Sequence, residues 1–156
     1  MSNCQNIEAY SAHISVTFGE TEPFLGTIYV KGDGNHAVFS WPTQANTKET
    51  TELAEFKTQT KWVTSKDGCK KSKFADPDPK FVGMVSHEGY ELISAENGKN
   101  VYSSNGITCT YNVDELRREV ISSIVFDDAK IEFTNVKLAP QDPALFDPPR
   151  DCDESD

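Results

Sequence analysis

Four cysteines and three histidines are the residues whose types could carry chemistry in this chain. The cysteines are Cys4, Cys69, Cys109 and Cys152, spread over nearly all of the 156 residues. None of them belongs to a C-x-x-C pair, which argues against a zinc site. An even, dispersed count is instead typical of two disulfides, and the spacing leaves all three pairings open. The alternative is four free thiols in a reducing compartment.

The histidines offer no catalytic arrangement. His13, His36 and His87 each fall on a predicted polar strand face or in a turn, where we expect exposed side chains. Ser86, His87 and Glu88 are adjacent in the sequence, so their side chains point in different directions and cannot converge as those of a triad do. No G-x-S-x-G, phosphate-loop or H-E-x-x-H motif occurs. We therefore predict no catalytic residues and a protein that is not an enzyme.

The charge of the chain excludes several classes of partner. With 25 acidic against 15 basic residues the net charge is −10, whereas nucleic acids and anionic membranes select clusters of Lys and Arg. No apolar run approaches the ~18 residues that a membrane span needs. An acidic surface could hold Ca²⁺ weakly, but no EF-hand spacing is present. We predict no nucleic-acid partner, no membrane span, no cofactor and no defined metal site, and calcium binding stays open.

Aromatic residues on predicted strands are more informative. Ala37, Phe39 and Trp41 alternate along one face of a strand, and Phe56 and Trp62 share a face in the same way. A packed core explains such a pattern, but a curved antiparallel sheet also often encloses an apolar cavity for a small molecule. The predicted ligand-binding residues are Phe18, Phe39, Trp41, Phe56, Trp62, Met84, Tyr90 and Phe133.

A meander of antiparallel strands is expected to position these residues. Apolar and polar residues alternate without a break over residues 10–18, as in a half-buried strand. Asn97-Gly98 and Asn105-Gly106 are typical of hairpin turns, because both residue types tolerate the positive φ that such turns need. Residues 49–56 fit either a short helix or a loop. Further strands are predicted at 26–31, 36–41, 58–64, 81–86, 90–95, 100–104, 107–111 and 129–134, for roughly eight to ten in all.

One late segment is predicted to be helical. In NVDELRREVISSIVF, residues 112–126, apolar positions recur every three or four residues. Asn112 and Glu115 fit the two halves of a capping box. The predicted fold is therefore mainly β: a single-domain curved antiparallel sheet, or open half-barrel, with this helix packed on its concave face. The domain is expected to cover residues 1–152, and residues 153–156 to form an acidic tail.

The end of the chain carries the most specific resemblance. FTNVKLAPQDPALFDPPRDC, residues 133–152, resembles the C-terminal signature of the ependymin-related (LVN-type) family. That signature is an aromatic strand followed by Asp-Pro, a small residue, an aliphatic residue, Phe, paired prolines and a cysteine. The matching residues are Asp142, Pro143, Ala144, Leu145, Phe146, Pro148, Pro149 and Cys152. Weaker similarity spans nearly the whole chain and includes the cysteine segments NCQNIEAYSAHIS and ITCTYNVDEL.

This resemblance implies a fold like that of the bacterial lipoprotein carriers, an open half-barrel that clasps a helix. The implied disulfides are Cys4–Cys109 and Cys69–Cys152. The last segment, residues 139–152, would then be a strap drawn back across the sheet. Leu145 and Phe146 would fill an apolar dent beneath it, and the prolines would keep the crossing extended.

The resulting functional hypothesis is a secreted or lumenal binding protein that holds a hydrophobic ligand, such as a lipid or fatty acid, in the half-barrel. The first residues, MSNCQNIE, contain no hydrophobic stretch typical of a secretory signal. The alternative function is an extracellular adhesion or matrix protein that responds to calcium and has no small-molecule ligand. A homodimer is compatible with both hypotheses.

Overall fold

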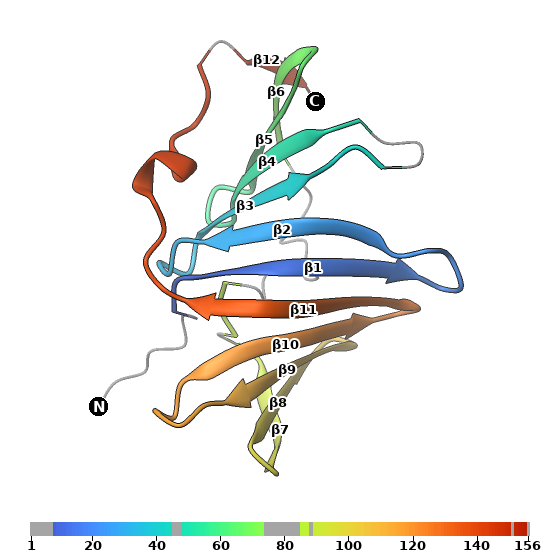
Figure 1. Ribbon diagram of the computed structural model, residues 1–156, viewed down its shortest axis with the longest axis vertical. Helices are drawn as coiled ribbons and strands as arrows, with labels where there is room; N and C mark the ends of the chain where they lie inside the picture. Colours follow the sequence, from blue (N-terminus) through green and yellow to red (C-terminus); the bar gives the residue numbers. More distant parts are fainter. Residues whose placement is uncertain (1–7, 45–47, 74–84, 88, 151, 156) are drawn as a thin grey trace.

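A single curved β-sheet is the frame of the molecule. The computed structural model describes residues 8–44, 48–73, 85–87, 89–150 and 152–155. Within them the chain forms one sheet of twelve strands (Figure 1). The elements are β1 Tyr10–Phe18, β2 Phe24–Val30, β3 His36–Trp41, β4 Thr50–Glu55, β5 Thr60–Ser65, β6 Gly68–Lys73, β7 Glu91–Glu96, β8 Lys99–Ser104, β9 Ile107–Val113, β10 Glu119–Phe126, β11 Ala129–Leu138, the 3-10 turn η1 Pro143–Phe146 and β12 Asp153–Ser155.

The strand order places β1 beside β11 near the centre of the sheet. The order is β12-β6-β5-β4-β3-β2-β1-β11-β10-β9-β8-β7. Strands β1 to β6 run outward from the centre to one edge, and β7 to β11 run from the other edge back to the centre. β1 and β11 therefore pair antiparallel, from Tyr10 opposite Leu138 to Phe18 opposite Ala129. At one edge the short β12 pairs parallel with β6.

Alternation along the strands gives the sheet two unlike faces. We call the face with the larger core the inner face and the opposite one the outer face. The buried inner-face core is Tyr10, Ala12, Ile14, Val16, Ile28, Val30, Ala37, Phe39, Trp41, Ala54, Phe56, Val85, Ile107, Cys109, Tyr111, Ile121, Ile124, Ile131 and Phe133. The buried outer-face core is Val38, Leu53, Trp62 and Phe146. The inner face thus carries buried apolar side chains from β1 to β4 and from β9 to β11.

The strap, residues 139–152, lies on the outer face, and the structure describes all of it except residue 151. Figure 1 shows it leaving the end of β11, passing the ends of β1 and β2 to η1, and continuing to β12. Phe146 in η1 is 4% exposed and packs into the outer-face core. A disulfide joins Cys152 to Cys69 in β6, which confirms this implied pairing. The expectation for Leu145 is wrong, because its side chain is 37% exposed and fills no dent.

The predicted late helix is wrong, and the half-barrel has no helix on its concave face there. Glu119–Phe126 is strand β10, paired with β9 and β11. In the described ranges the one helical element is η1. The turn before β10 is held by Asp114, whose carboxylate accepts hydrogen bonds from the backbone N–H groups of Leu116 and Arg118. A side chain that binds nearby backbone donors in this way competes with helix formation.

A β-bulge explains why the apolar spacing in β10 resembles that of a helix. The register with β9 shifts between Ile121 and Ser123, so Ser122 is an extra residue in the strand. The bulge resets the alternation, and Ile121 and Ile124 both enter the inner-face core although they are three residues apart. A spacing of three on one face is also the helical signature. The β-branched residues of the segment, by contrast, suit a strand.

Local strand and turn signals are otherwise reliable. β1 and β3 have the predicted bounds. Asn97 and Asn105 have φ values of 57° and 48°, and the glycine after each also has positive φ, so both predicted hairpin turns are confirmed. Residues 49–56, which fit a helix or a loop by sequence, contain strand β4. The strand predicted over residues 81–86 lies largely outside the described residues.

Candidate functional site

The inner face carries a row of aromatic rings over β2 and β3. The ring centroids of Phe24 and Trp41 are 4.8 Å apart, and Phe39 stacks on Trp41 at 5.8 Å with an interplanar angle of 2°. The indole N–H of Trp41 donates to Oε2 of Glu52 at 2.8 Å. Because its one polar group has a partner, the indole can lie against the sheet at low cost. Phe39 and Trp41 are 4% and 7% exposed, so the ring contacts hold the row in place within the inner-face core.

Gly26 in β2 makes room for this row. A Cβ atom at Gly26 would come within 2.6 Å of Cζ3 of Trp41. We expect Gly26→Ala to lower the free energy of unfolding by about 1–3 kcal/mol, because the indole has to shift away from Phe24 and Phe39. Urea unfolding followed by tryptophan fluorescence measures this loss. Thr27→Ala, the next position on the opposite face, is the control and should stay within about 0.5 kcal/mol of the parent protein; equal losses would refute the steric explanation.

Three phenylalanines lie at one end of the central strands, on the right in Figure 1, where β1 ends, β2 begins and β10 ends. Phe18 ends β1, Phe24 begins β2 and Phe126 ends β10, and pairing places Ala129 opposite both Phe18 and Phe126. Phe18 is 50% exposed, and the other two phenylalanines are half-buried and pack against the inner-face core. We call these three residues the aromatic rim. They form an accessible apolar margin beside the buried aromatic row.

A polar cluster lies on the inner face over β8 to β10. The Glu119 carboxylate accepts hydrogen bonds from Nε2 of His87 at 2.7 Å, from the Tyr102 hydroxyl at 2.6 Å and from the Asn100 amide at 2.9 Å. The ring of His87 also stacks on that of Tyr102, with centroids 4.0 Å apart. The cluster therefore ties residues 85–87, which precede β7, to the inner face.

Electrostatics favour a charged Glu119 in this cluster. Burial alone would raise the pKa of its carboxyl group, but hydrogen bonds from His87, Tyr102 and Asn100 and the charge of His87 lower it from 4.5 to about 2. Burial, followed by the hydrogen bond to Glu119, raises the pKa of Tyr102, which stays a neutral donor. The carboxylate is thus fully engaged as an acceptor. The cluster therefore has a structural role. We use the term fastening for a polar cluster of this kind, which holds one part of the chain against another.

Cys109 in β9 is a buried free thiol on the same face. The implied disulfide between Cys4 and Cys109 is therefore wrong for Cys109, and Cys4 lies outside the described residues. Burial raises the pKa of the Cys109 thiol to about 11, although hydrogen bonds with Tyr111 and Tyr90 lower it in part. A thiol that stays protonated at neutral pH is a poor nucleophile.

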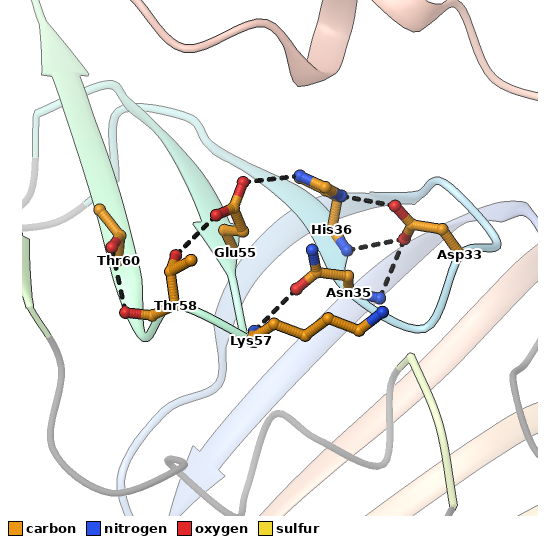
Figure 2. Close-up of polar contacts among 7 residues, drawn as sticks. All are labelled: Asp33, Asn35, His36, Glu55, Lys57, Thr58 and Thr60. Carbon is orange, nitrogen blue, oxygen red and sulfur yellow. Dashed lines mark hydrogen bonds and ion pairs between the residues drawn. The ribbon is translucent and has the colours of Figure 1, made fainter.

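His36 forms a second fastening, at the start of β3 (Figure 2). Its Nδ1 lies 2.6 Å from Oδ2 of Asp33 and its Nε2 lies 2.9 Å from Oε2 of Glu55. Only the protonated ring can donate at both nitrogens. The ring also meets that of Phe146 edge-on, with centroids 6.4 Å apart. His36 thus joins the β2–β3 turn, the end of β4 and the strap.

The two carboxylates of this fastening are shifted toward their charged forms. Burial raises the pKa of Asp33, but hydrogen bonds from the backbone N–H groups of His36 and Asn35 and from the His36 ring lower it overall. The hydroxyl of Thr58, at 2.6 Å, lowers the pKa of Glu55, and His36 lowers it further. The prediction of exposed histidines is therefore wrong for His36, and His87 is likewise only 8% exposed.

The structure brings most of the predicted ligand-binding residues together. Those in the inner-face core, or packed against it, are Phe39, Trp41, Phe56, Phe133 and Tyr90. Phe18 belongs to the aromatic rim. Met84 lies outside the described residues. Trp62 lies on the outer face with Phe146, so its predicted common face with Phe56 is wrong. The turn between them, with Gln59 at φ 55°, interrupts the alternation.

Sequence reasoning missed Phe24 and the carboxylate partners of the histidines. Phe24 continues the alternation of Ile28 and Val30 past Gly26, and this period-two pattern could have identified it. Glu119 is 32 residues from His87 and Glu55 is 19 residues from His36. No local signal connects residues at such separations.

The described ranges hold no group of three or more His, Cys, Asp or Glu side chains placed to bind a metal ion. They also contain no helix that is long and apolar enough to cross a membrane.

Comparison with known proteins supports the fold. No protein-family model and no curated protein matches the chain. A solved structure of an uncharacterized conserved protein from Thermus thermophilus is similar, with a TM-score of 0.58, 13% identity and coverage of 95% of this chain and 90% of that one. A LolA superfamily protein from Nitrosomonas europaea is also similar, with a TM-score of 0.52, 12% identity and coverage of 94% of this chain and 91% of that one. The fold is LolA-like. The ependymin-related family stays a prediction that rests on the tail motif.

Proposed function

We propose that this protein is a non-enzymatic carrier that holds a hydrophobic ligand, such as a lipid or fatty acid, against the inner face of its LolA-like sheet. The observation that carries the proposal is the aromatic rim. Phe18, Phe24 and Phe126 leave apolar surface open to solvent at the margin of an aromatic row that is otherwise buried.

The free energy of apolar contact supports this site. Each Å² of apolar surface removed from water contributes about 25 cal/mol, and a phenylalanine ring can bury well over 100 Å². Exposed apolar surface that adjoins a core is a common mark of a binding site. A ligand that covers the three rim rings would continue the row formed by Phe24, Trp41 and Phe39. Likeness of fold to a LolA superfamily protein agrees with a carrier by analogy.

The disulfide supports a secreted or lumenal location for such a carrier. Cys69 and Cys152 are joined across 83 positions of sequence. Disulfides of this kind persist in oxidising compartments and are rare in the cytosol. We therefore propose that the protein meets its ligand outside the cytosol.

Phe24→Ser tests the proposed site, with Leu25→Ser as a matched control. The two residues are neighbours in β2, but Phe24 faces the aromatic row and Leu25 is 54% exposed on the outer face. With a fluorescent long-chain fatty acid as the probe, we expect Phe24→Ser to weaken binding by about tenfold or more, since one buried aromatic side chain contributes ~1.5–3 kcal/mol. Leu25→Ser should change the affinity less than twofold.

Two results would count against the proposal. One is the absence of saturable fatty-acid binding together with no apolar molecule in native mass spectra of the folded protein. The other is an equal loss of affinity in both variants. The first result, combined with calcium-dependent self-association on a sizing column, would favour the adhesion or matrix hypothesis instead.

A further inference from the structure

The outer face carries a polar groove that is not part of the proposed ligand site. It has a volume of about 400 Å³ and lies between β1, β2 and β11. The residues that line it are Ser11, Ala12, His13, Thr27, Tyr29, Asn135 and Lys137. Most of these positions alternate with the inner-face core residues of the same strands, so the sheet itself separates the groove from the aromatic row.

A bulge at the centre of the sheet shapes this groove. Ser11 is opposite Lys137 and His13 is opposite Thr134. Two residues of β11, Asn135 and Val136, therefore lie opposite the single residue Ala12 of β1. Asn135 is one of the two and has φ 51°. Bulges bend a strand and redirect its side chains, and they occur often beside functional sites. Here the bulge sets Asn135 and Lys137 beside the polar side chains of β1 and β2.

The polar side chains of the groove have no partners in the described part of the chain. The hydroxyl groups of Ser11, Thr27 and Tyr29, the ring of His13, the amide of Asn135 and the ammonium of Lys137 make no side-chain hydrogen bond or ion pair there. His36 and His87, in contrast, each bind carboxylates. Six groups able to donate hydrogen bonds therefore converge on one groove with their donors unused.

The charge of the lining points to an anion. No Asp or Glu lines the groove, although the chain has 25 acidic residues and a net charge of −10. Lys137 supplies a full positive charge. A phosphate group offers several strong acceptor oxygens to such a set of donors. The volume lies at the lower end of the range of ordinary small-molecule sites and leaves room for more than a bare phosphate ion.

We propose that the outer groove binds the phosphate group of a small molecule or of a lipid headgroup. Lys137 provides the charged contact, and the hydroxyl and amide groups of the groove donate to the remaining oxygens. The site is independent of the hydrophobic ligand site, because it lies on the other face of the sheet.

Inorganic phosphate is the probe for the first test, at constant ionic strength maintained with chloride. We expect saturable shifts of the backbone amide signals of residues 11–13, 27–29 and 134–137. Lys137→Gln should weaken this binding about tenfold, as the loss of a charge-assisted contact does. Lys130→Gln, an equal change of charge at an exposed position in the same strand, should weaken it less than twofold.

Vesicles that contain phosphatidic acid distinguish the two sources of the phosphate group. If the protein sediments with these vesicles, and if free phosphate or the Lys137→Gln substitution prevents this, the phosphate group belongs to a lipid headgroup. Phosphate binding without vesicle binding would assign a soluble phosphate ester. The proposal is overturned if phosphate gives no saturable shifts beyond those of chloride, or if both lysine variants lose affinity equally. Fatty-acid binding should be the same in all three proteins, so failure here is separable from failure of the carrier proposal.

Discussion

Removal of the Cys69–Cys152 disulfide is expected to lower the free energy of unfolding by about 4.5 kcal/mol. The two cysteines are 83 positions apart, and in the chain-entropy model a crosslink over a loop of this length restricts the unfolded chain by about that amount. Folded domains are stable by only about 5–15 kcal/mol in total. The Cys69→Ser/Cys152→Ser variant should therefore be marginally folded in water and unfold at much lower urea concentration.

Urea unfolding of three samples measures this effect: the oxidised protein, the serine double variant and the parent protein under reducing conditions. The last two should coincide, because Cys109 is a buried free thiol and reductant leaves it unchanged. If the double variant keeps the stability of the oxidised protein, the strap is held by Phe146 and its neighbours alone. A partial loss under reductant only would show that the bond is protected from reduction in the folded state.

The disulfide also shows how far local sequence patterns can reach. Spacing leaves three pairings for four cysteines, and only the tail resemblance selected Cys69–Cys152. The same resemblance selected Cys4–Cys109, and Cys109 is free. A bond between positions so far apart depends on strand order and on the path of the strap over the outer face. Neither of these is encoded by neighbouring residues.

Strands were predictable where one uninterrupted alternation decides the structure. β1 alternates over its whole length, and the Asn-Gly turns need only two residues to be recognised. The prediction for the residues of β10 is wrong because a single extra residue, Ser122, changes the period of the apolar side chains. Trp62 was assigned to the wrong face because the turn at Gln59 breaks the alternation in the same way. Bulges and turns change which face a side chain occupies, and periodicity alone does not show where they are.

The inner-face core was predictable from residue type, but the polar fastenings were not. Phe39, Trp41 and Phe133 enter the core because apolar side chains on one strand face have to be buried together. His87 is buried and His36 is half-buried because each finds a carboxylate on a strand brought near by the sheet. Without such partners a histidine is expected at the surface. The prediction of exposed histidines therefore failed where tertiary pairing overrides residue type.

Acid is expected to remove the contribution of Glu119 to stability. Its folded-state pKa, about 2, is below the ordinary value of 4.5. A carboxyl group with a depressed pKa stabilises the folded state above the ordinary value and loses this effect as the pH falls through the folded value. Since each pKa unit corresponds to about 1.4 kcal/mol, the contribution is of the order of 3 kcal/mol at neutral pH and disappears between about pH 4.5 and pH 2.

Glu119→Gln isolates this effect, because the amide has the shape of the protonated acid but carries no charge. We expect the variant to be less stable than the parent protein by about 2–3 kcal/mol at pH 6, where the charged hydrogen bonds to His87, Tyr102 and Asn100 are lost or weakened. The difference should shrink steadily below pH 4.5 and be nearly absent at pH 2. Glu91→Gln makes the same charge change at an exposed position in β7 and should show little difference at any pH.

The comparison between variants matters because other carboxylates also lose stabilising contacts in acid. Hydrogen bonds lower the pKa of Glu55, from Thr58 first and then from His36, and they lower the pKa of Asp33 in the same way. The parent protein is therefore expected to lose stability below pH 4 for that reason as well. Those contributions are common to the parent protein and Glu119→Gln and cancel in the difference. A difference that stays constant from pH 6 to pH 2 would mean that packing of residue 119, rather than its charge, holds residues 85–87 on the inner face.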